Sequence, residues 1–224
     1  MGFFISSMTI KKKPWPTKDA MEQVYELNLW GGNRDFYSGV GSHSSEIIIP
    51  YIDAVRLFLT SFSDKQTVCD LGCGDFNIGK ELVKYSQKYI AVDIVEGLIK
   101  HNIKTFTEDN LEFQCLDIAI DDLPKGDCVI LRQVLQHLSN VEIQKVLSKL
   151  NKFKYVILTE HIPKGNFEAN RDIISGQGIR LKKQSGVNVL ATPFNLNVKA
   201  EKELLSLTLK NGKEIIVTTL YTML

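Results

Sequence analysis

Strand-like and helical segments alternate through the middle of this chain, and the alternation limits the folds open to it. Short apolar runs, typical of buried strands, are separated by stretches with apolar residues at helical spacing. The expected strands and helices follow in the order 67–71, 78–87, 89–93, 95–106, 111–116, 127–131, 141–151 and 154–160. This order predicts an α/β protein, with a parallel sheet covered by helices on both faces.

The pattern changes near the C-terminal end. Residues 202–210 and 213–223 are typical of two strands, and Asn211-Gly212 between them is the strongest short hairpin signal. The last strand must then run antiparallel to its neighbour. We therefore expect a seven-stranded sheet with six parallel strands and one antiparallel strand in a C-terminal hairpin.

A glycine-containing loop follows the first expected strand. The run Asp70–Gly74 has the sequence Asp-Leu-Gly-Cys-Gly and opens into a helical pattern. Its glycines let the backbone approach a ligand closely, and the first free N–H groups of the helix are expected to point at that ligand. Asp70 would repel a dinucleotide phosphate and attract an ammonium or a sulfonium. An ordinary strand-to-helix turn is the simpler alternative.

Two further acids follow the next two strands. Strand 89–92 ends in Asp93, which suits a carboxylate that accepts both hydroxyls of a ribose. The strand near 111–116 ends in Asp117, where a carboxylate can accept from an exocyclic amine. Ligands of open α/β sheets lie beyond the carboxyl ends of the strands, so these acids predict one binding site at that edge.

The three acids, the glycine loop and the run 129–138 together resemble the class I S-adenosylmethionine-dependent methyltransferases. The resemblance covers residues 65–160 and the C-terminal hairpin, and it implies a Rossmann-like sheet. It also implies S-adenosylmethionine as cofactor and S-adenosylhomocysteine as product. Phe76 stands where many members have a third glycine. We therefore expect a bulkier loop and a slightly different approach of the cofactor.

The resemblance assigns roles to residues of this chain. The expected cofactor-binding residues are Asp70, Gly72, Cys73, Gly74, Asp93, Ile94, Asp117, Ile118, Gln133 and Tyr37. In the family the first loop holds the methionine part, the acid after strand two the ribose, and the acid after strand three the adenine. Tyr37 belongs to the loop Tyr37–Ser44, which resembles a flap over the cofactor, with a plain linker as the alternative.

Methyl transfer from a sulfonium is an in-line displacement, so positioning supplies most of the acceleration and no fixed catalytic triad is expected. The candidate bases are His137, Glu160 and His161. His137 has an alternative interpretation as a helix-terminal histidine packed under the sheet. Glu160 and His161 end the fifth strand, where one of the two should face the cleft. The acceptor is expected between Tyr37–Ser44, Arg132–His137 and the loop after Glu160.

The chain has 224 residues, 44% of them apolar, which is enough for one large domain with a small cap. We expect a flexible tail over 1–16, an N-terminal helical cap with the flap loop over 17–60, and the S-adenosylmethionine-binding domain over 61–224. The four cysteines are interpreted as small hydrophobes in a reducing compartment, the cytoplasm, with Cys115 and Cys128 in buried strands. No Cys-x-x-Cys pair occurs, so no metal site is expected.

These features favour transfer of a methyl group to an oxygen or nitrogen atom of a small-molecule acceptor. A net charge of +1 argues against a nucleic-acid partner, and no stretch is long enough for a bilayer span. An NAD(P)-dependent oxidoreductase is an alternative, although Asn77 stands where its last phosphate-loop glycine belongs. A catalytically silent, cofactor-binding partner subunit is another. The sequence favours no oligomeric state.

Overall fold

The computed structural model describes residues 14–32 and 36–224, so most of the expected tail lies outside the described residues. Its helices and strands, in chain order, are α1 (Thr17–Glu26), α2 (Ser45–Leu59), β1 (Thr67–Leu71), α3 (Gly79–Leu82), β2 (Lys88–Asp93), α4 (Glu96–Thr105), β3 (Leu111–Cys115), β4 (Cys128–Arg132), α5 (Asn140–Leu147), β5 (Tyr155–Pro163), β6 (Val198–Thr208) and β7 (Glu214–Met223).

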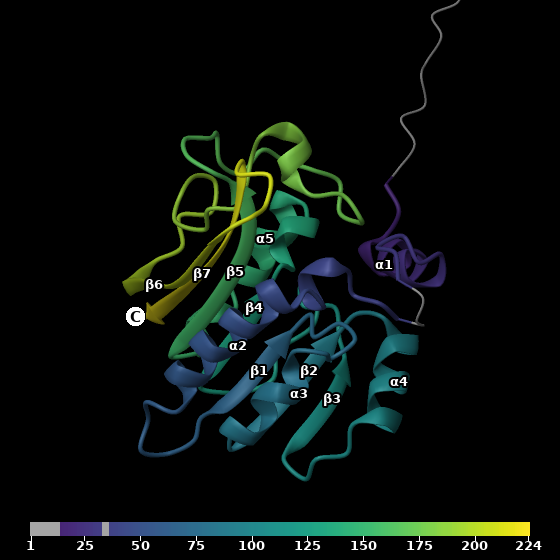
Figure 1. Cartoon of the computed structure of the whole chain (residues 1–224), viewed down its shortest axis with the longest axis vertical. Coiled ribbons are helices and arrows are strands. Elements are labelled where there is room, and N and C mark those ends of the chain that lie inside the picture. Colours follow the sequence, from purple (N-terminus) through teal and green to yellow (C-terminus); the bar gives the residue numbers. More distant parts are fainter. Residues whose placement is uncertain (1–13, 33–35) are drawn as a thin grey trace, which may run out of the picture.

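All the strands join in one sheet (Figure 1). It has seven strands in the order β3-β2-β1-β4-β5-β7-β6. β7 pairs antiparallel with both β5 and β6, whereas the pairs among β1 to β5 are parallel. The predicted fold is therefore confirmed, including the hairpin at Asn211-Gly212 and its single antiparallel strand.

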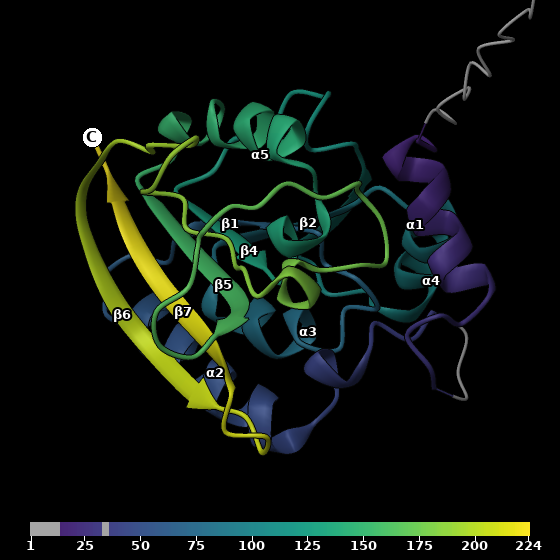
Figure 2. The same cartoon turned by 90° about the horizontal axis from the view of Figure 1, so that it is seen from above.

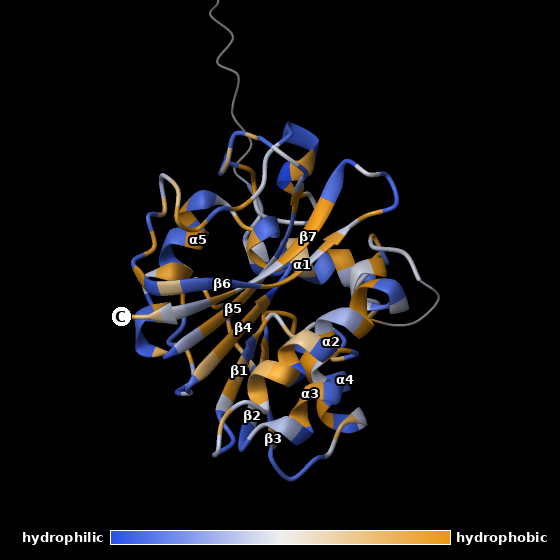
Figure 3. Ribbon diagram, turned by 60° about the vertical axis from the view of Figure 1, so that its left-hand side comes forward, coloured by the Kyte–Doolittle hydropathy of each residue, from blue (hydrophilic) through white to orange (hydrophobic). Residues whose placement is uncertain are grey.

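Helices cover both faces of the sheet (Figure 2). α2 and α3 lie on one face, where Tyr51, Val55 and Leu82 pack with the strand residues Val68 and Ile130. α5 lies on the other face with the alternate strand residues. The central strands are largely hydrophobic on both sides (Figure 3), as strands buried between two helical layers must be.

α1 lies apart from these layers, beside α4 (Figure 1). Tyr25 of α1 packs with Val95 and Leu98 at the start of α4. The segment 17–60 thus contains one helix at the edge of the molecule and one, α2, that belongs to a sheet layer. Its description as a separate cap stays a prediction.

Local signals explain several element boundaries. A capping box starts α5, with Ser139 and Glu142 bonded reciprocally. The helix expected over 78–87 is shorter: α3 is followed by a 3-10 turn at Val83–Tyr85, and the Ser86 hydroxyl donates to Val83 O. None of the helices in the described residues combines the length and hydrophobicity needed to cross a membrane.

Two strand predictions need correction. β5 extends to Pro163 because β7 pairs with it along its whole length, so Glu160 and His161 lie inside the strand and not at its end. Cys115 is exposed because β3 is the edge strand, whereas Cys128 on the central β4 is buried as expected.

Candidate functional site

One cavity of about 480 Å³ opens at the carboxyl ends of the strands. It brings together most of the residues that the sequence analysis singled out. The predicted residues in its walls are Asp70, Gly72, Cys73, Gly74, Asp93, Ile94, Asp117, Ile118, Gln133, His137 and His161. Tyr37 and Glu160 are not among the lining residues. The strand ends therefore converge on one site, as an open α/β sheet requires.

The loop after β1 needs its two glycines. Gly72 has a φ of 87° and Gly74 a φ of 57°, in the left-handed region that glycine adopts readily. A Cβ atom on Gly72 would lie 2.4 Å from Cγ2 of Val134, and one on Gly74 would lie 2.5 Å from Oγ of Ser38. The loop can therefore pass closely under its neighbours only without side chains at these positions.

The backbone N–H groups of this loop are already occupied. Each N–H group of residues 72–75 donates to an acceptor within the protein. The acceptors are Val92 O, Asp93 Oδ2 and Ser38 Oγ. These four N–H groups are therefore not free to bind a ligand, whereas the expectation for the N–H groups at the start of the following helix stays a prediction. Because phosphates bind at glycine loops through such free donors, the loop is poorly suited to a dinucleotide.

Phe76 follows the loop with a φ of 59°, and its ring is fully buried. The ring packs in the core against Tyr89, Phe106 and Phe113. The bulk expected at this position lies below the loop, away from the cavity, and does not narrow the cofactor side.

Asp70 and Asp93 are buried carboxyl groups in the cavity wall. The Tyr89 hydroxyl donates to Asp70 Oδ2 at 2.9 Å. Burial raises the pKa of Asp70 to about 6, against the opposing effects of that hydrogen bond and of the Arg132 charge. Burial also raises the pKa of Asp93, although its oxygens accept backbone N–H groups from Gly74 and Val95. A cationic or donor-rich ligand would stabilise both carboxylates.

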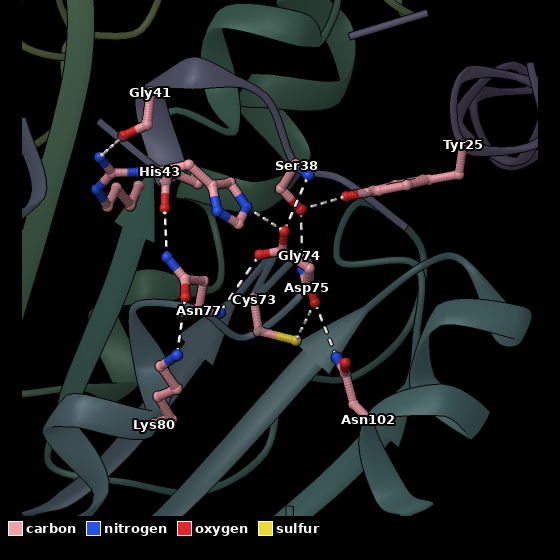
Figure 4. Close-up of polar contacts among 12 residues, drawn as sticks. Tyr25, Ser38, Gly41, His43, Cys73, Gly74, Asp75, Asn77, Lys80 and Asn102 are labelled. Carbon is pink, nitrogen blue, oxygen red and sulfur yellow. Dashed lines mark hydrogen bonds and ion pairs between the residues drawn. The ribbon is translucent and has the colours of Figure 1, made fainter. Parts of the chain in front are cut away.

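The segment 37–44 lies over the glycine loop and is bonded to it (Figure 4). Ser38 and Asp75 exchange two hydrogen bonds: Ser38 N donates to Asp75 Oδ2, and Asp75 N donates to Ser38 Oγ. His43 Nε2 lies 2.5 Å from the same Asp75 oxygen. Asn77 Nδ2 donates to Ser42 O. Tyr37 stacks on His43, with the ring centroids 4.4 Å apart.

His137 lines the cavity but is held as a neutral ring. Burial lowers the pKa of His137 to about 4, and its Nδ1 lies 3.1 Å from Gly176 O. A neutral ring donates from Nδ1 to that carbonyl, which leaves Nε2 to accept from Gln136 Nε2 at 3.3 Å. The indole of Trp30 packs beside it. This environment weakens His137 as a proton acceptor.

The strand neighbours Glu160 and His161 face opposite sides of β5, as the alternation predicts. His161 lines the cavity, and its Nε2 lies 3.1 Å from Glu214 Oε2. Burial lowers the pKa of His161, against the effect of the Glu214 carboxylate. Glu160 is 4% exposed and points away from the cavity. Burial raises the pKa of Glu160 to about 8, although the Arg180 charge opposes that shift.

The sequence analysis missed other residues of the cavity wall. Arg132 had appeared only as the boundary of a segment, although a charged residue ending an apolar strand is a usable signal. Other examples are Ile47, Tyr51, Leu209 and Ile216. Leu209 and Ile216 come from the C-terminal hairpin, and no local motif connects that hairpin to the site.

Comparisons with known proteins agree with this geometry. Residues 68–153 match the model of a methyltransferase domain family. Phosphoethanolamine N-methyltransferase 1 of Triticum aestivum is 30% identical over 105 residues, which are 44% of this chain and 21% of that protein. Malonyl-[acyl-carrier protein] O-methyltransferase of Acetivibrio thermocellus is 32% identical over 107 residues, 46% of this chain and 36% of that protein. The matches thus span about a fifth to a third of these relatives.

Solved structures share the fold at low sequence identity. The N-methyltransferase NodS of Bradyrhizobium japonicum, in complex with S-adenosylhomocysteine, superposes with a TM-score of 0.61 at 10% identity, covering 89% of this chain and 98% of that one. A 1,6-didemethyltoxoflavin-N1-methyltransferase of Burkholderia thailandensis gives 0.59 at 13% identity, covering 92% and 87%.

Proposed function

We propose that this chain is a class I S-adenosylmethionine-dependent methyltransferase and that it methylates an oxygen or nitrogen atom of a small molecule. The match of residues 68–153 to a methyltransferase domain family and the shared fold support the proposal. One observation carries the proposal. The glycine loop offers no free N–H group to a phosphate, while the carboxylates Asp70, Asp93 and Asp117 stand in the cavity wall. A wall with few free N–H donors and three carboxylates suits a cofactor that carries an ammonium group and a sulfonium group.

The residues present fit S-adenosylmethionine. Asp70 and the backbone of Gly72–Gly74 hold the methionine end in our assignment, and Asp93 accepts the ribose hydroxyls. Asp117 with Ile118 frames the adenine. Ile94, Cys73 and Gln133 complete the cofactor walls, and all of them line the cavity. The segment 37–44 closes over this half as a flap, with Tyr37 bracing His43 instead of touching the cofactor.

S-adenosylmethionine supplies an activated methyl group, so the protein's own part is to position the acceptor and to take a proton from it. His161 is the best-placed base, because it lines the cavity and Glu214 orients its ring. Gln136 accepts from the His161 backbone N–H through Oε1, which ties this strand to the loop after β4. His137 keeps a packing role in this assignment, and Glu160 has none in proton transfer.

We also propose that residues 17–60 form an N-terminal cap and residues 61–224 the cofactor-binding domain. A cytoplasmic location is proposed as well, supported by four cysteines that remain thiols. A catalytically silent partner subunit would use the same cofactor cavity. Turnover of methyl-labelled S-adenosylmethionine against a panel of small alcohols, acids and amines separates the enzyme from that alternative.

Asp93→Asn tests the cofactor site without changing the shape of the side chain. We expect S-adenosylhomocysteine to bind the native protein and to bind this variant at least about tenfold more weakly, because charged hydrogen bonds contribute about 1.5–3 kcal/mol each. Isothermal titration calorimetry measures both affinities. Asp122→Asn is the matched control, since the Asp122 side chain is 98% exposed. Equal affinities in a folded Asp93→Asn protein would refute the ribose assignment.

A further inference from the structure

Arg132 is a half-buried cation that the cofactor assignment does not use. It ends β4, lines the cavity and lies over the Tyr51 ring, 4.8 Å from the centroid. Within residues 14–32 and 36–224, no carboxylate lies within ion-pair distance of its guanidinium. A charge held this way normally acquires a counter-charge, because withdrawing an unpaired ion even partly from water is costly.

The hydrogen bonds of Arg132 leave part of its donor set unused. Nη2 donates to Gly41 O at 2.5 Å, and Nη1 donates to Ser42 Oγ at 3.3 Å. A guanidinium has five N–H groups, two on each terminal nitrogen. Three N–H groups therefore have no acceptor among the described residues: one on each terminal nitrogen, and the one on Nε, which is buried. Two such groups form the fork that matches a carboxylate.

The nearest acids are already bonded to other partners. Asp70 accepts from the Tyr89 hydroxyl, and Asp75 accepts from Ser38 N and contacts His43. Both act on Arg132 only over a longer range. Neither acid is bonded to Arg132, so the free N–H groups of Arg132 stay available to a ligand. The negative charges of the two acids nevertheless disfavour a ligand group that carries two negative charges. A single carboxylate balances one guanidinium, whereas a phosphate dianion would not.

The wall near Arg132 is otherwise apolar. β4 alternation places Arg132 on the same sheet face as Ile130, the face that α2 covers. Ile47 and Tyr51 line the cavity from α2, and Leu209 and Ile216 line it from the C-terminal hairpin. An occupant of this half would thus place one charged group at Arg132 and apolar atoms against the hairpin.

We propose that Arg132 binds the carboxylate of the methyl acceptor, so that the acceptors are small carboxylic acids with an apolar body. The inference rests on the proposed function and names its substrate class. It divides the cavity by charge: the acids at the ends of β1, β2 and β3 face the cationic cofactor, and the arginine at the end of β4 faces the anionic acceptor.

Matched probes test this assignment by binding alone. Benzoate and hexanoate are titrated calorimetrically into protein saturated with S-adenosylhomocysteine, beside benzamide and hexanamide, which have the same shape without the charge. We expect each carboxylate to bind at least about tenfold more tightly than its amide, since charged hydrogen bonds are about twice as strong as neutral ones. Phenyl phosphate is the third arm, and tighter binding of it than of benzoate would overturn the carboxylate assignment.

Arg132→Gln should lose the preference for carboxylates while binding S-adenosylhomocysteine within about threefold of the native protein. Arg132→Lys should keep part of the preference, because it retains the charge without the fork. Arg56→Gln removes an exposed arginine of α2 and is the control for lost charge.

Two results would overturn the assignment: equal affinity of the native protein for carboxylates and amides, or an unchanged preference in Arg132→Gln. The native comparison decides alone if that variant does not fold. Absence of S-adenosylhomocysteine binding by the native protein would instead overturn the proposed function, and the acceptor assignment with it.

Discussion

Three glycines of this chain differ in backbone strain and in close contacts, and these two demands can be tested separately. Gly72 needs a left-handed backbone and also lies against Val134. Gly165 has a similar φ of 85°, but no atom lies within 4 Å of the place where a Cβ would stand. Gly178 has open space and no left-handed φ. The three positions form a series in which strain and contact are added one at a time.

Alanine at these glycines should therefore lower the free energy of unfolding in steps. We expect a change within about 0.5 kcal/mol for Gly178→Ala and a loss of about 1–2 kcal/mol for Gly165→Ala from backbone strain. Gly72→Ala should lose about 2–5 kcal/mol, since overpacking adds about 1–3 kcal/mol. Urea unfolding measures all three. Equal losses for Gly72→Ala and Gly165→Ala would show that Val134 moves aside freely.

The buried Glu160 carboxyl predicts a pH effect on stability. Its folded pKa, raised by burial to about 8, exceeds the reference value of 4.5. Between those pH values the folded state keeps a proton that the unfolded state has lost, so this group's contribution falls as pH rises through the window. Glu160→Gln has no such proton. Its stability relative to the native protein should rise between pH 5 and pH 8 by roughly 2–4 kcal/mol.

Urea unfolding at both pH values measures the effect of Glu160→Gln, and the difference from the native protein cancels the other titrating groups. Glu168→Gln, on a side chain that is 67% exposed, is the control and should show the same difference at both pH values. A pH-independent difference for Glu160→Gln would mean that the carboxyl ionises normally in the folded protein.

At the scale of elements, the segment 37–44 depends on one side chain of the glycine loop. Asp75 accepts Ser38 N and contacts His43 Nε2. Asp75→Asn keeps the shape and removes the charge, so one charge-assisted bond of about 1.5–3 kcal/mol is weakened. Amide hydrogen exchange of residues 38–44 should accelerate roughly tenfold. Asp64→Asn, in an exposed loop, is the control; unchanged exchange in Asp75→Asn would assign the anchoring to Tyr25 and Asn77 instead.

Local sequence signals predicted the elements well where the signal and the cause were both local. The succession of strands and helices along the chain through β5 and the hairpin at Asn211-Gly212 belong to this class. The end of β5 and the exposure of Cys115 could not be predicted from local signals. The first depends on pairing with β7, and the second on the position of β3 at the edge of the sheet. The acids at strand ends led to the cavity. Ile216 escaped notice because only the completed sheet brings it there.

At the scale of the whole molecule, the sheet builds the two halves of the cavity from different parts of the chain. The cofactor half uses the ends of β1, β2 and β3, and the acceptor half uses α2, β4, β5 and the hairpin. β7 lies between β5 and the outermost strand, β6, so it connects the acceptor half to that edge of the sheet. The antiparallel strand β7 thus supplies both Ile216 in the wall and Glu214 beside His161.

The position of β7 also determines the order in which the strands can pair during synthesis. A ribosome makes the chain from its N-terminal end, and folding follows that direction. β6 leaves the ribosome before β7, yet β7 is its sheet neighbour, so β6 waits unpaired until β7 has been made. A nascent chain of residues 1–197 already carries every acid of the cofactor half. Such a chain carries the donor side of the cavity, while the recipient's side still lacks the part of the wall that Leu209 and Ile216 complete.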